Sequence, residues 1–484
     1  MSALLKRLTA LMLAALLFAA LFGCGGDKGA VSDETSAKIT EAEAEEAETT
    51  YPPPDASDLD LKGQKVSLIA PQWSTCKYLF AEEIDGDAVN DEAYRRAANV
   101  EEVLGIEIEH YWGQDTDTHL TVMKTVKAGD DAYQIVFTHC IYGLQDYVVS
   151  GALYPLDDLT RVDLEAPWWD KPVIESMRLG GKIFYAAGDL LLQNPSAVVF
   201  NKDISENYGF DNHYEAVNEG KWTFDRFYQE ARGVSVDLDG DGEIGINDQC
   251  GYSGDLAEAL CDITYACGEK CSVAEGDEIK LVFYSEKILD VFEKAYSYFT
   301  DSSVCQGYFR HVADGQIFSS GLSLFSIRSL GGIVGLRSAD VDFGILPLPK
   351  YNEAQEEYYV FPWPIYVCVP TTIQSPELVG AALERFCYES APVLNAQNEI
   401  LIRGKSTRDE ESLAMIDIIQ SSYVSDIGAS YLGFDPNFSK VFYSFSTLIQ
   451  KKNENLASEY SKAETAILKS IEKLCEKIAE ASEG

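Results

Sequence analysis

Short apolar runs alternate with longer stretches of helical periodicity from Lys65 onward. Val66–Ile69, Ile106–Tyr111 and Gln134–Thr138 have the length and composition of β-strands. Between the first two runs, a stretch beginning near Asp91 repeats apolar residues at helical spacing and stops at Gly105, which is typical of a helix C-terminus. Strands separated by helices predict a parallel, doubly wound α/β sheet.

The same alternation starts again with strands predicted at Lys182–Tyr185 and Ala197–Phe200. Further helices follow, one of them opened by Ser375 and Pro376, which suit the N-cap and the first helical position. A long amphipathic helix closes the chain, with the inward-facing residues Tyr460, Ile467, Ile471, Leu474 and Ile478. A pattern that restarts in a chain of 484 residues predicts two domains.

The N-terminus has the features of a secretory signal peptide over residues 1–23. Two basic residues precede an apolar run from Leu8 to Phe22. This run is shorter than the ~20 residues that span a bilayer, so an uncleaved membrane anchor is the less favoured alternative. The ending Leu21-Phe22-Gly23-Cys24 resembles the lipobox of bacterial lipoproteins, although Phe22 is bulkier than the residue usual there. The resemblance implies a lipid on Cys24, which would hold the protein at the extracellular face of the cell membrane.

Residues 24–62 are predicted to form a disordered acidic tether between the lipid and the folded part. They are rich in Gly, Ser, Thr, Glu, Ala and Pro and contain few apolar side chains, so they cannot bury enough surface to become ordered. The whole chain carries a net charge of −41, which repels nucleic acids and anionic lipids. We therefore expect no nucleic-acid partner, and contact with the membrane through the lipid anchor only.

Eleven cysteines raise the question of disulfide bonds, because exported proteins often contain them. The ten that follow Cys24 show no regular framework, and several stand in apolar runs, so free buried thiols are favoured. Cys261, Cys267 and Cys271 stand close together in the sequence, and whether any of them form a disulfide stays open.

An acidic segment from Asp237 to Asp248 has the ligand spacing of an EF-hand-type calcium loop. Carboxylates occupy loop positions 1, 3, 5 and 12, and Gly242 stands at position 6, where the chain must turn sharply. Glu243, at position 7, would offer its backbone carbonyl. Oxygen ligands at this density suit Ca²⁺, and an acidic surface turn is the alternative. The predicted metal ligands are Asp237, Asp239, Asp241, Glu243 and Asp248.

Several segments are similar, in order and spacing, to those of family 1 extracellular solute-binding proteins, the lipid-anchored receptors of carbohydrate ABC importers. The matching segments are 89–91 through 105–108, 134–137, 200–203, 221–224, 342–350, 375–379 and 407–412. The resemblance implies a two-lobed periplasmic-binding-protein-like fold of type II, whose hinge-linked, doubly wound sheets close on a solute. It implies an N-terminal lobe of residues 63–183 plus 310–350, and a C-terminal lobe of residues 184–309 plus 351–484 that carries the calcium loop.

The ligand candidates are polar and aromatic residues near predicted strand ends and lobe junctions, since open α/β sheets bind ligands at the carboxyl ends of their strands. Trp73 follows the first strand, and Trp363 stands between two prolines after the segment that resembles a return crossover. Tryptophan rings can stack on the C–H faces of sugars, but a core or surface position is an equal alternative for each. His139, Asp189 and Arg328 are the polar candidates.

The sequence favours binding over catalysis, because the five histidines form no paired metal spacing and no nucleophile motif occurs. We expect a receptor that captures a carbohydrate, an oligosaccharide in the favoured interpretation, and delivers it to ABC transporter permease subunits. A secreted carbohydrate-active hydrolase and a receptor for a non-sugar solute such as a peptide are the alternatives.

Overall fold

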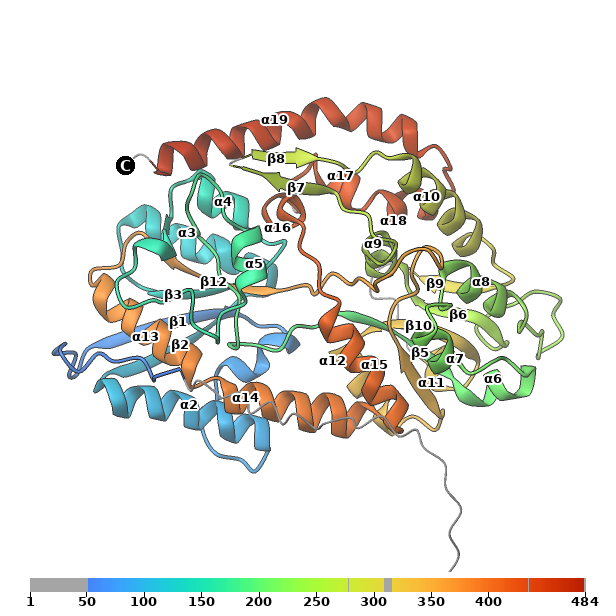
Figure 1. The fold of residues 1–484 in the computed structure, drawn as a ribbon, viewed down its shortest axis with the longest axis horizontal. Helices are drawn as coiled ribbons and strands as arrows, with labels where there is room; N and C mark the ends of the chain where they lie inside the picture. Colours follow the sequence, from blue (N-terminus) through green and yellow to red (C-terminus); the bar gives the residue numbers. More distant parts are fainter. Residues whose placement is uncertain (1–50, 277, 309–315, 434, 483–484) are drawn as a thin grey trace, which may run out of the picture. The chain divides into compact units, whose positions relative to one another are not determined.

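The strands form two five-stranded sheets and one two-stranded sheet in the part of the chain that the computed structural model describes, residues 51–482 without 277, 309–315 and 434 (Figure 1). The first sheet has the order β2-β1-β3-β12-β4, formed by Glu107–Gly113, Lys65–Pro71, Ile135–His139, Ile365–Pro370 and Leu153–Tyr154. The second has the order β11-β5-β10-β6-β9, formed by Phe343–Leu346, Ser196–Asn201, Ser323–Ser329, Cys250–Asp255 and Cys305–Tyr308. The small sheet pairs β7 (Ser272–Glu275) with β8 (Glu278–Leu281).

Helices fill most of the connections between these strands. Up to β5 they are α2 (Ala88–Leu104), α3 (Thr118–Ala128), α4 (Leu144–Val149) and α5 (Lys171–Ser176). From β5 to β12 they are α6 (Lys202–Tyr208), α7 (His213–Asn218), α8 (Phe224–Arg232), α9 (Leu256–Ala266), α10 (Glu286–Phe299), α11 (Gln316–Ser319) and α12 (Leu330–Val334). After β12 they are α13 (Pro376–Tyr388), α14 (Ala391–Ala396), α15 (Glu410–Ser421), α16 (Ile427–Leu432), α17 (Ser439–Phe442), α18 (Ser444–Gln450) and α19 (Leu456–Ser482). Short 3-10 turns are η1 (Ser74–Leu79), η2 (Asp115–Asp117), η3 (Leu156–Asp158) and η4 (Gly335–Ser338), and η5 (Gln397–Ser406) is a π-helix.

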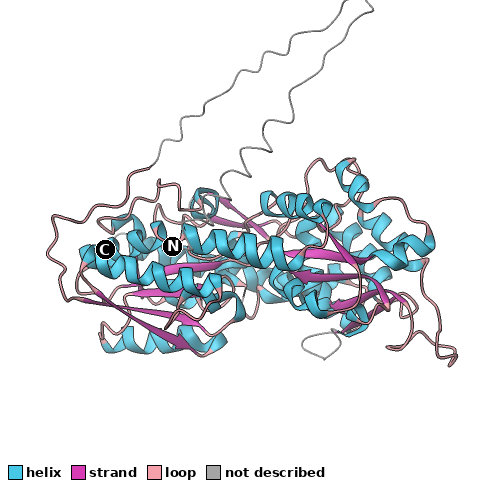
Figure 2. Ribbon diagram, turned by 90° about the horizontal axis from the view of Figure 1, so that it is seen from below, coloured by secondary structure: helices cyan, strands magenta, loops and turns pink. Residues whose placement is uncertain are grey.

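Both faces of the inner strands β1, β3 and β12 are buried, which explains why these strands are mostly apolar, whereas the edge strand β2 is mostly exposed or half-buried and carries polar residues. Leu68, Phe137 and Val367 pack in one core with α2 and α13. The alternating residues, such as Val136 and Cys368, pack in another core with α3 and α4. The side view shows helices on both sides of the strands (Figure 2). The predicted two-sheet, doubly wound α/β fold is confirmed.

The predicted division of the chain into two lobes is wrong for the strands after residue 310. Residues 310–350 were expected in the N-terminal lobe, but β10 and β11 both pair with β5 in the second sheet. Residues after 351 were expected in the C-terminal lobe, yet β12 pairs with β3 in the first sheet. The chain therefore returns to the first sheet between β11 and β12. We call the first sheet with its packed helices the first lobe, and the second sheet with its helices the second lobe.

The segment Lys182–Tyr185 does not form the predicted strand. Ile183, Phe184 and Tyr185 are buried, but Lys182 makes only an isolated bridge to Leu179. Next to it, Ala186 makes an isolated bridge to Val367. This segment is apolar because its side chains are buried beside the first sheet, although its backbone is not paired as a strand.

The predicted disorder over residues 24–62 is wrong for residues 51–62, and residues 24–50, with Cys24, lie outside the described part. Leu61 is only 6% exposed. The Tyr51 ring meets the Trp168 ring edge-on at 5.2 Å between centroids, and the Arg161 guanidinium lies 2.5 Å from the Asp58 carboxylate. The few apolar residues of this segment are enough to attach it to the first lobe, because they pack against apolar surface that is already there.

The ten cysteines within the described residues form no disulfide bond with one another, and nine of them are buried. Cys261, Cys267 and Cys271 form no disulfide with one another or with any other described cysteine. Burial raises the pKa of the Cys267 thiol to about 12 and the pKa of the Cys271 thiol well above its ordinary value. Across the described residues, none of the helices combines the length and the apolar character needed to span a bilayer.

Candidate functional site

Three of the predicted ligand residues meet at one edge of the first sheet. β1 ends at Pro71, two residues before Trp73, and β3 ends at His139. β12 runs antiparallel to β3 with Ile365 opposite His139, so Trp363 enters the sheet at the edge where β1 and β3 leave it. The carboxyl ends of parallel strands share an edge, which is where open α/β sheets bind ligands. The structure therefore brings Trp73, His139 and Trp363 together at this edge.

The three rings form a contiguous aromatic group. The centroids of Trp73 and His139 lie 4.4 Å apart with an interplanar angle of 67°. His139 and Trp363 are nearly parallel, at 6.2 Å and 24°. Tyr142 joins the group edge-on to Trp73 at 5.2 Å, a contact that sequence reasoning missed. Trp73 and Trp363 are partly exposed, whereas His139 is only 8% exposed, so the two indoles can offer ring surface to a ligand.

His139 is a neutral hydrogen-bonding group at the centre of this aromatic group. Burial lowers its pKa to about 3, so the imidazole carries no charge at physiological pH. The backbone N–H of Ile141, which can only donate, lies 3.5 Å from Nδ1. Nδ1 therefore accepts, and the ring hydrogen resides on Nε2.

Asp262 connects this edge of the first sheet to the second lobe. It lies on α9, directly after β6, and Trp363 Nε1–H donates to its Oδ1 at 2.9 Å. The side chain is fully buried, and its Oδ2 has no hydrogen-bond partner within the described residues. Burial raises the pKa of Asp262 to about 7. Sequence reasoning missed Asp262, although a carboxylate on an otherwise apolar helix face was a signal that could have found it.

Trp363 has a backbone φ of +48°, a conformation that bulky residues rarely adopt. Backbone strain of this kind costs about 1–3 kcal/mol and collects at functional sites. The strained backbone and the hydrogen bond to Asp262 together fix the orientation of the Trp363 indole.

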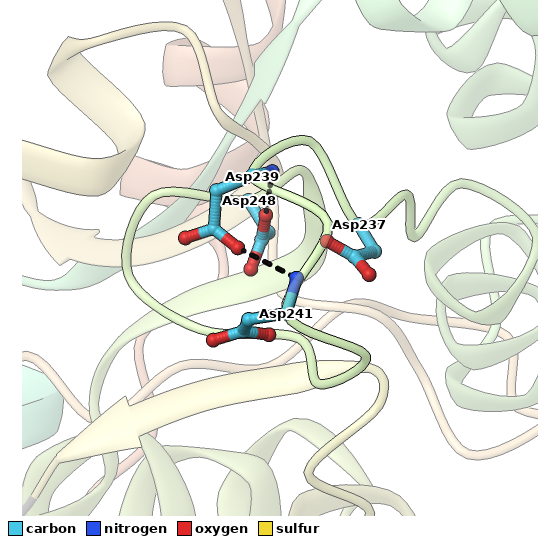
Figure 3. Close-up of side chains that lie close together, drawn as sticks. All are labelled: Asp237, Asp239, Asp241 and Asp248. Carbon is cyan, nitrogen blue, oxygen red and sulfur yellow. Dashed lines mark hydrogen bonds between the residues drawn. The ribbon is translucent and has the colours of Figure 1, made fainter.

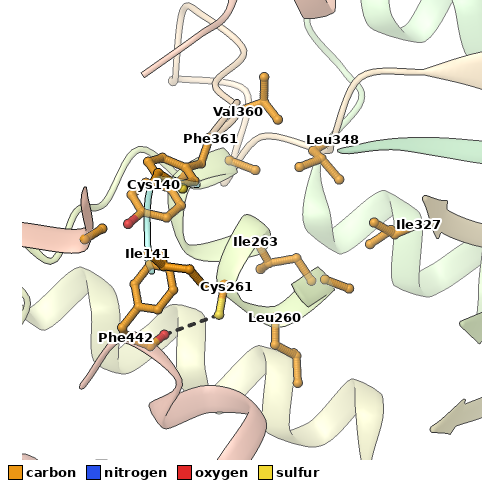
Figure 4. Close-up of a cluster of buried hydrophobic side chains, with 14 of the residues drawn as sticks. Cys140, Ile141, Leu260, Cys261, Ile263, Ile327, Leu348, Val360, Phe361 and Phe442 are labelled. Carbon is orange, nitrogen blue, oxygen red and sulfur yellow. Dashed lines mark hydrogen bonds between the residues drawn. The ribbon is translucent and has the colours of Figure 1, made fainter. Parts of the chain in front are cut away.

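Buried apolar side chains form a wall against which Trp363 packs, and Figure 4 shows part of this wall. Phe361 and Phe442 contact the Trp363 ring edge-on, at 5.3 and 5.9 Å between centroids. The Cys261 thiol donates to the backbone oxygen of Phe442 at 3.3 Å, which ties α9 to α17. This wall joins the loop after β3, α9 and the C-terminal helices in one core, so the aromatic group rests on a rigid base.

The other two predicted ligand residues lie elsewhere. Arg328, on β10 opposite Ala197 of β5, has its guanidinium carbon 6.0 Å from the centroid of the Phe318 ring. Asp189 lines a separate hollow of about 380 Å³, together with Asp170 and Trp169. Burial and the neighbouring Asp170 raise the pKa of Asp189 to about 6. Neither residue directly follows a strand of the first sheet, so the rule about the carboxyl ends of strands does not apply to them.

The acidic loop brings four of its five predicted metal ligands together (Figure 3). Carboxylate oxygens of Asp237, Asp239, Asp241 and Asp248 all lie within 4.8 Å of one another. Converging carboxylate oxygens are the donor set that Ca²⁺ prefers, so these residues fit that ion. Glu243 does not contribute its carboxylate to this group.

Local hydrogen bonds hold the loop in shape. Asp237 accepts from the backbone N–H groups of Gly240 and Gly242, at 2.6 and 2.9 Å. Both glycines have positive φ, +79° and +91°, which other residues would adopt only with strain. Asp248 accepts from Leu238 and Gly245, both at 2.7 Å, and such hydrogen bonds lower its pKa. The loop is therefore ordered by its own backbone, with three exposed carboxylates arranged beside a buried one.

No known protein-family profile and no curated protein sequence matches this chain. Solved structures do match it in fold. The galacto-N-biose-/lacto-N-biose I-binding protein of the ABC transporter from Bifidobacterium longum has a TM-score of 0.61 at 13% identity, over 85% of this chain and 98% of that one. An ABC substrate-binding protein from Listeria monocytogenes, in complex with cycloalternan, has a TM-score of 0.57 at 12% identity, over 85% and 100%. UgpB from Mycobacterium tuberculosis, in complex with glycerophosphocholine, has a TM-score of 0.56 at 13% identity, over 86% and 99%. At these identities the likeness shows the shared two-lobed fold.

Proposed function

We propose that this protein is a lipid-anchored extracellular receptor that captures a carbohydrate, in particular an oligosaccharide, for an ABC importer. The observation that carries the proposal is the group formed by Trp73, His139 and Trp363 at the carboxyl edge of the first sheet, fastened to the second lobe through Asp262. The fold is shared with proteins whose names describe sugar binding, and this likeness supports the proposal.

Each member of the group has a role that suits a neutral, hydroxyl-rich ligand. The partly exposed indoles of Trp73 and Trp363 offer flat apolar surface to the C–H face of a sugar ring. His139 supplies an uncharged N–H donor, because its Nδ1 already accepts from Ile141. In the proposed mechanism, the bound solute interacts with both lobes and stabilises the closed arrangement by its higher affinity for it. The permease subunits would recognise that closed arrangement.

Attachment to the membrane belongs to the same proposal and is supported by the sequence. Cys24, outside the described residues, would become the N-terminal residue after cleavage and carry the lipid. In the native host, Cys24→Ala is expected to release the protein from the membrane fraction or to leave the signal peptide uncleaved. An unchanged mature mass together with unchanged membrane attachment would contradict the anchor without bearing on the sugar site.

We also propose a structural calcium ion in the loop from Asp237 to Asp248. Four carboxylates that converge within 4.8 Å repel one another unless a cation or protons neutralise them. The ion would be held by these carboxylates and by the backbone carbonyl of Glu243. Its contribution would be to the stability of the second lobe.

A ligand screen tests the main proposal. Purified protein would be titrated with neutral oligosaccharides, short peptides and glycerophosphodiesters by thermal shift, followed by calorimetry of each hit. The proposal expects saturable binding of an oligosaccharide, with every added glycan recovered intact by product analysis. Hydrolysis products would favour the carbohydrate-active hydrolase. Binding of only a peptide or a glycerophosphodiester would favour a non-sugar receptor, and the glycerophosphocholine complex of a fold neighbour is the reason for including the latter class.

A further inference from the structure

A second hollow, distinct from the aromatic group, lies among the segments that join the two lobes. Its volume is about 380 Å³. One wall is formed by residues 188–193. Along the chain, these residues follow Ala186, which bridges to the first sheet, and precede β5 of the second sheet. Another wall comes from α14 and η5, which follow α13 of the first lobe and precede α15, a helix packed on β11. Tyr423, which completes the lining, bridges to Val360 in the return segment between β11 and β12.

Two carboxylates face this hollow without a basic partner. The residues that the structure places around it include Asp170 and Asp189 but no Lys, Arg or His. The Asp189 side chain makes no hydrogen bond or ion pair within the described residues, and Asp170 accepts one backbone N–H, from Val173 at 3.1 Å. Their mutual repulsion contributes to the raised pKa of Asp189. Carboxylates that are partly buried without a counter-charge are costly, and a bound cation removes that cost.

The remaining lining groups suit an organic cation more than a bare metal ion. Tyr423 contributes a partly exposed aromatic ring, and Trp169, which is only 3% exposed and donates its indole N–H to Glu384 at 3.1 Å, also lines the hollow. The Oε1 atom of Gln193 is buried and has no partner in the described part, so it can accept a hydrogen bond. Aromatic rings with carboxylates are the usual surroundings of bound ammonium groups. A bare divalent ion needs converging oxygens, which in this structure occur in the loop from Asp237 to Asp248.

We propose that this hollow binds a compact organic cation, a primary or quaternary ammonium group, held by Asp170 and Asp189 beside the ring of Tyr423. A free amine and an amine carried on a sugar share this chemistry. The inference does not depend on which solute the aromatic group of Trp73, His139 and Trp363 takes.

Calorimetric titration of the full-length protein with two molecules of nearly equal shape tests the proposal. tert-Butylammonium chloride is expected to bind saturably, whereas neutral tert-butanol should bind at least about tenfold more weakly, since a hydrogen bond to a charged partner contributes about that much. Sodium chloride at equal ionic strength controls for screening. Glucosamine and glucose, compared in the same way, would separate a sugar-borne amine from a free one.

Two isosteric substitutions locate the binding. Asp189→Asn should weaken tert-butylammonium at least about tenfold, and Asp170→Asn should do the same while keeping an N-cap for α5. Asp203→Asn, at an exposed carboxylate of α6, is the matched control and should leave the affinity unchanged. Melting curves verify that each variant is folded. Equal binding of tert-butylammonium and tert-butanol, no saturable binding of the ammonium, or wild-type affinity in folded Asp189→Asn would each overturn the proposal.

Discussion

The indole Nε1–H of Trp363 donates a 2.9 Å hydrogen bond to the buried carboxylate of Asp262. The first residue stands two positions before β12 of the first sheet, and the second lies on the helix that follows β6 of the second sheet. Each carries a feature that costs free energy, since Trp363 has a positive φ and Asp262 has a buried oxygen without a partner in the described part. Unfavourable features that meet at one contact are typical of functional sites.

Removing either indole should weaken sugar binding without unfolding the protein. Trp73→Ala and Trp363→Ala each delete an aromatic surface, and each is expected to cost about 1–3 kcal/mol of binding free energy, measured by calorimetry with the oligosaccharide identified in the screen. Tyr284→Ala removes a ring that is 44% exposed on the second lobe and should leave the affinity unchanged. Wild-type affinity in both tryptophan variants would show that the ligand binds elsewhere.

The Asp262 carboxyl should make stability depend on pH. Its pKa is about 7 in the folded protein, against an ordinary value of 3.8. Between pH 4 and pH 7 the folded state holds a proton that the unfolded state has released, so the free energy of unfolding falls as the pH rises through this window. Asp262→Asn can still accept from Trp363 but does not ionise. Its melting temperature relative to wild type should therefore increase between pH 4 and pH 7, by about 2–4 °C for each kcal/mol, and level off above.

Glu384 provides an independent comparison for this pH effect. It accepts from the indoles of Trp168 and Trp169, and burial raises its pKa to about 7. Glu384→Gln should show the same direction of pH dependence, with no effect on sugar affinity. Melting temperatures of wild type and Asp262→Asn that differ by the same amount at every pH would contradict the assignment to Asp262.

Chelation should lower the melting temperature if the acidic loop holds calcium. At a calcium concentration of 100 times the dissociation constant, binding stabilises the folded state by ~2.7 kcal/mol. Asp239→Ala or Asp241→Ala removes one of the converging carboxylates and should abolish the difference between calcium and chelator. Glu243→Ala is the matched control, because its carboxylate lies outside the converging group, so it should keep the difference. If chelator does not change the melting temperature of calcium-loaded wild type, the calcium proposal is wrong and the loop is an acidic surface turn.

Arg96 should be important for the stability of the first lobe. Its guanidinium is 1% exposed, donates to the backbone oxygens of Leu79 and Leu190 at 2.6 and 3.3 Å, and lies 4.2 Å from the Phe386 ring centroid. Arg96→Met leaves these acceptors without a donor and is expected to cost about 3 kcal/mol in denaturant unfolding. The neighbouring Arg95→Met removes a surface ion pair with Glu92 and should cost at most about 1 kcal/mol. Equal costs would show that the buried contacts add little.

Local patterns predicted individual elements well, because each depends on nearby residues. The run Val66–Ile69 lies within β1, and the stretch from Asp91 to Gly105 lies within α2 and its cap. The cap confirms the reasoning, since Gly105 adopts a φ of +69°. Lys182–Tyr185 was predicted wrongly because burial, and not strand pairing, made it apolar. The sheet to which β10, β11 and β12 belong depends on partners far away in the sequence, which periodicity does not encode.

The candidate site was predictable where strand ends determine it. Trp73 and His139 follow strands of one sheet, so the rule about carboxyl ends applied to them, whereas Trp363 was a candidate because it follows the segment that resembles the return crossover. Tyr142 and Asp262 were missed, because the first lies in a loop and the second on a helix of the other lobe. The contact of Asp262 arises only where a helix of the second lobe meets Trp363, whereas Tyr142 meets Trp73 within the first lobe.

The position of β12 next to β3 constrains how this chain can be synthesised and divided. Val367 pairs with Phe137, and between them the chain forms every strand of the second sheet. During translation, β3 therefore cannot pair with β12 until residue 370 has been made, and until then this edge of β3 has unpaired backbone groups. Contacts of such long sequence separation make folding slow. A fragment cut after residue 183 would lack β12 and α13. The first lobe is therefore a compact part of the structure, but it is not encoded by one continuous stretch of the sequence.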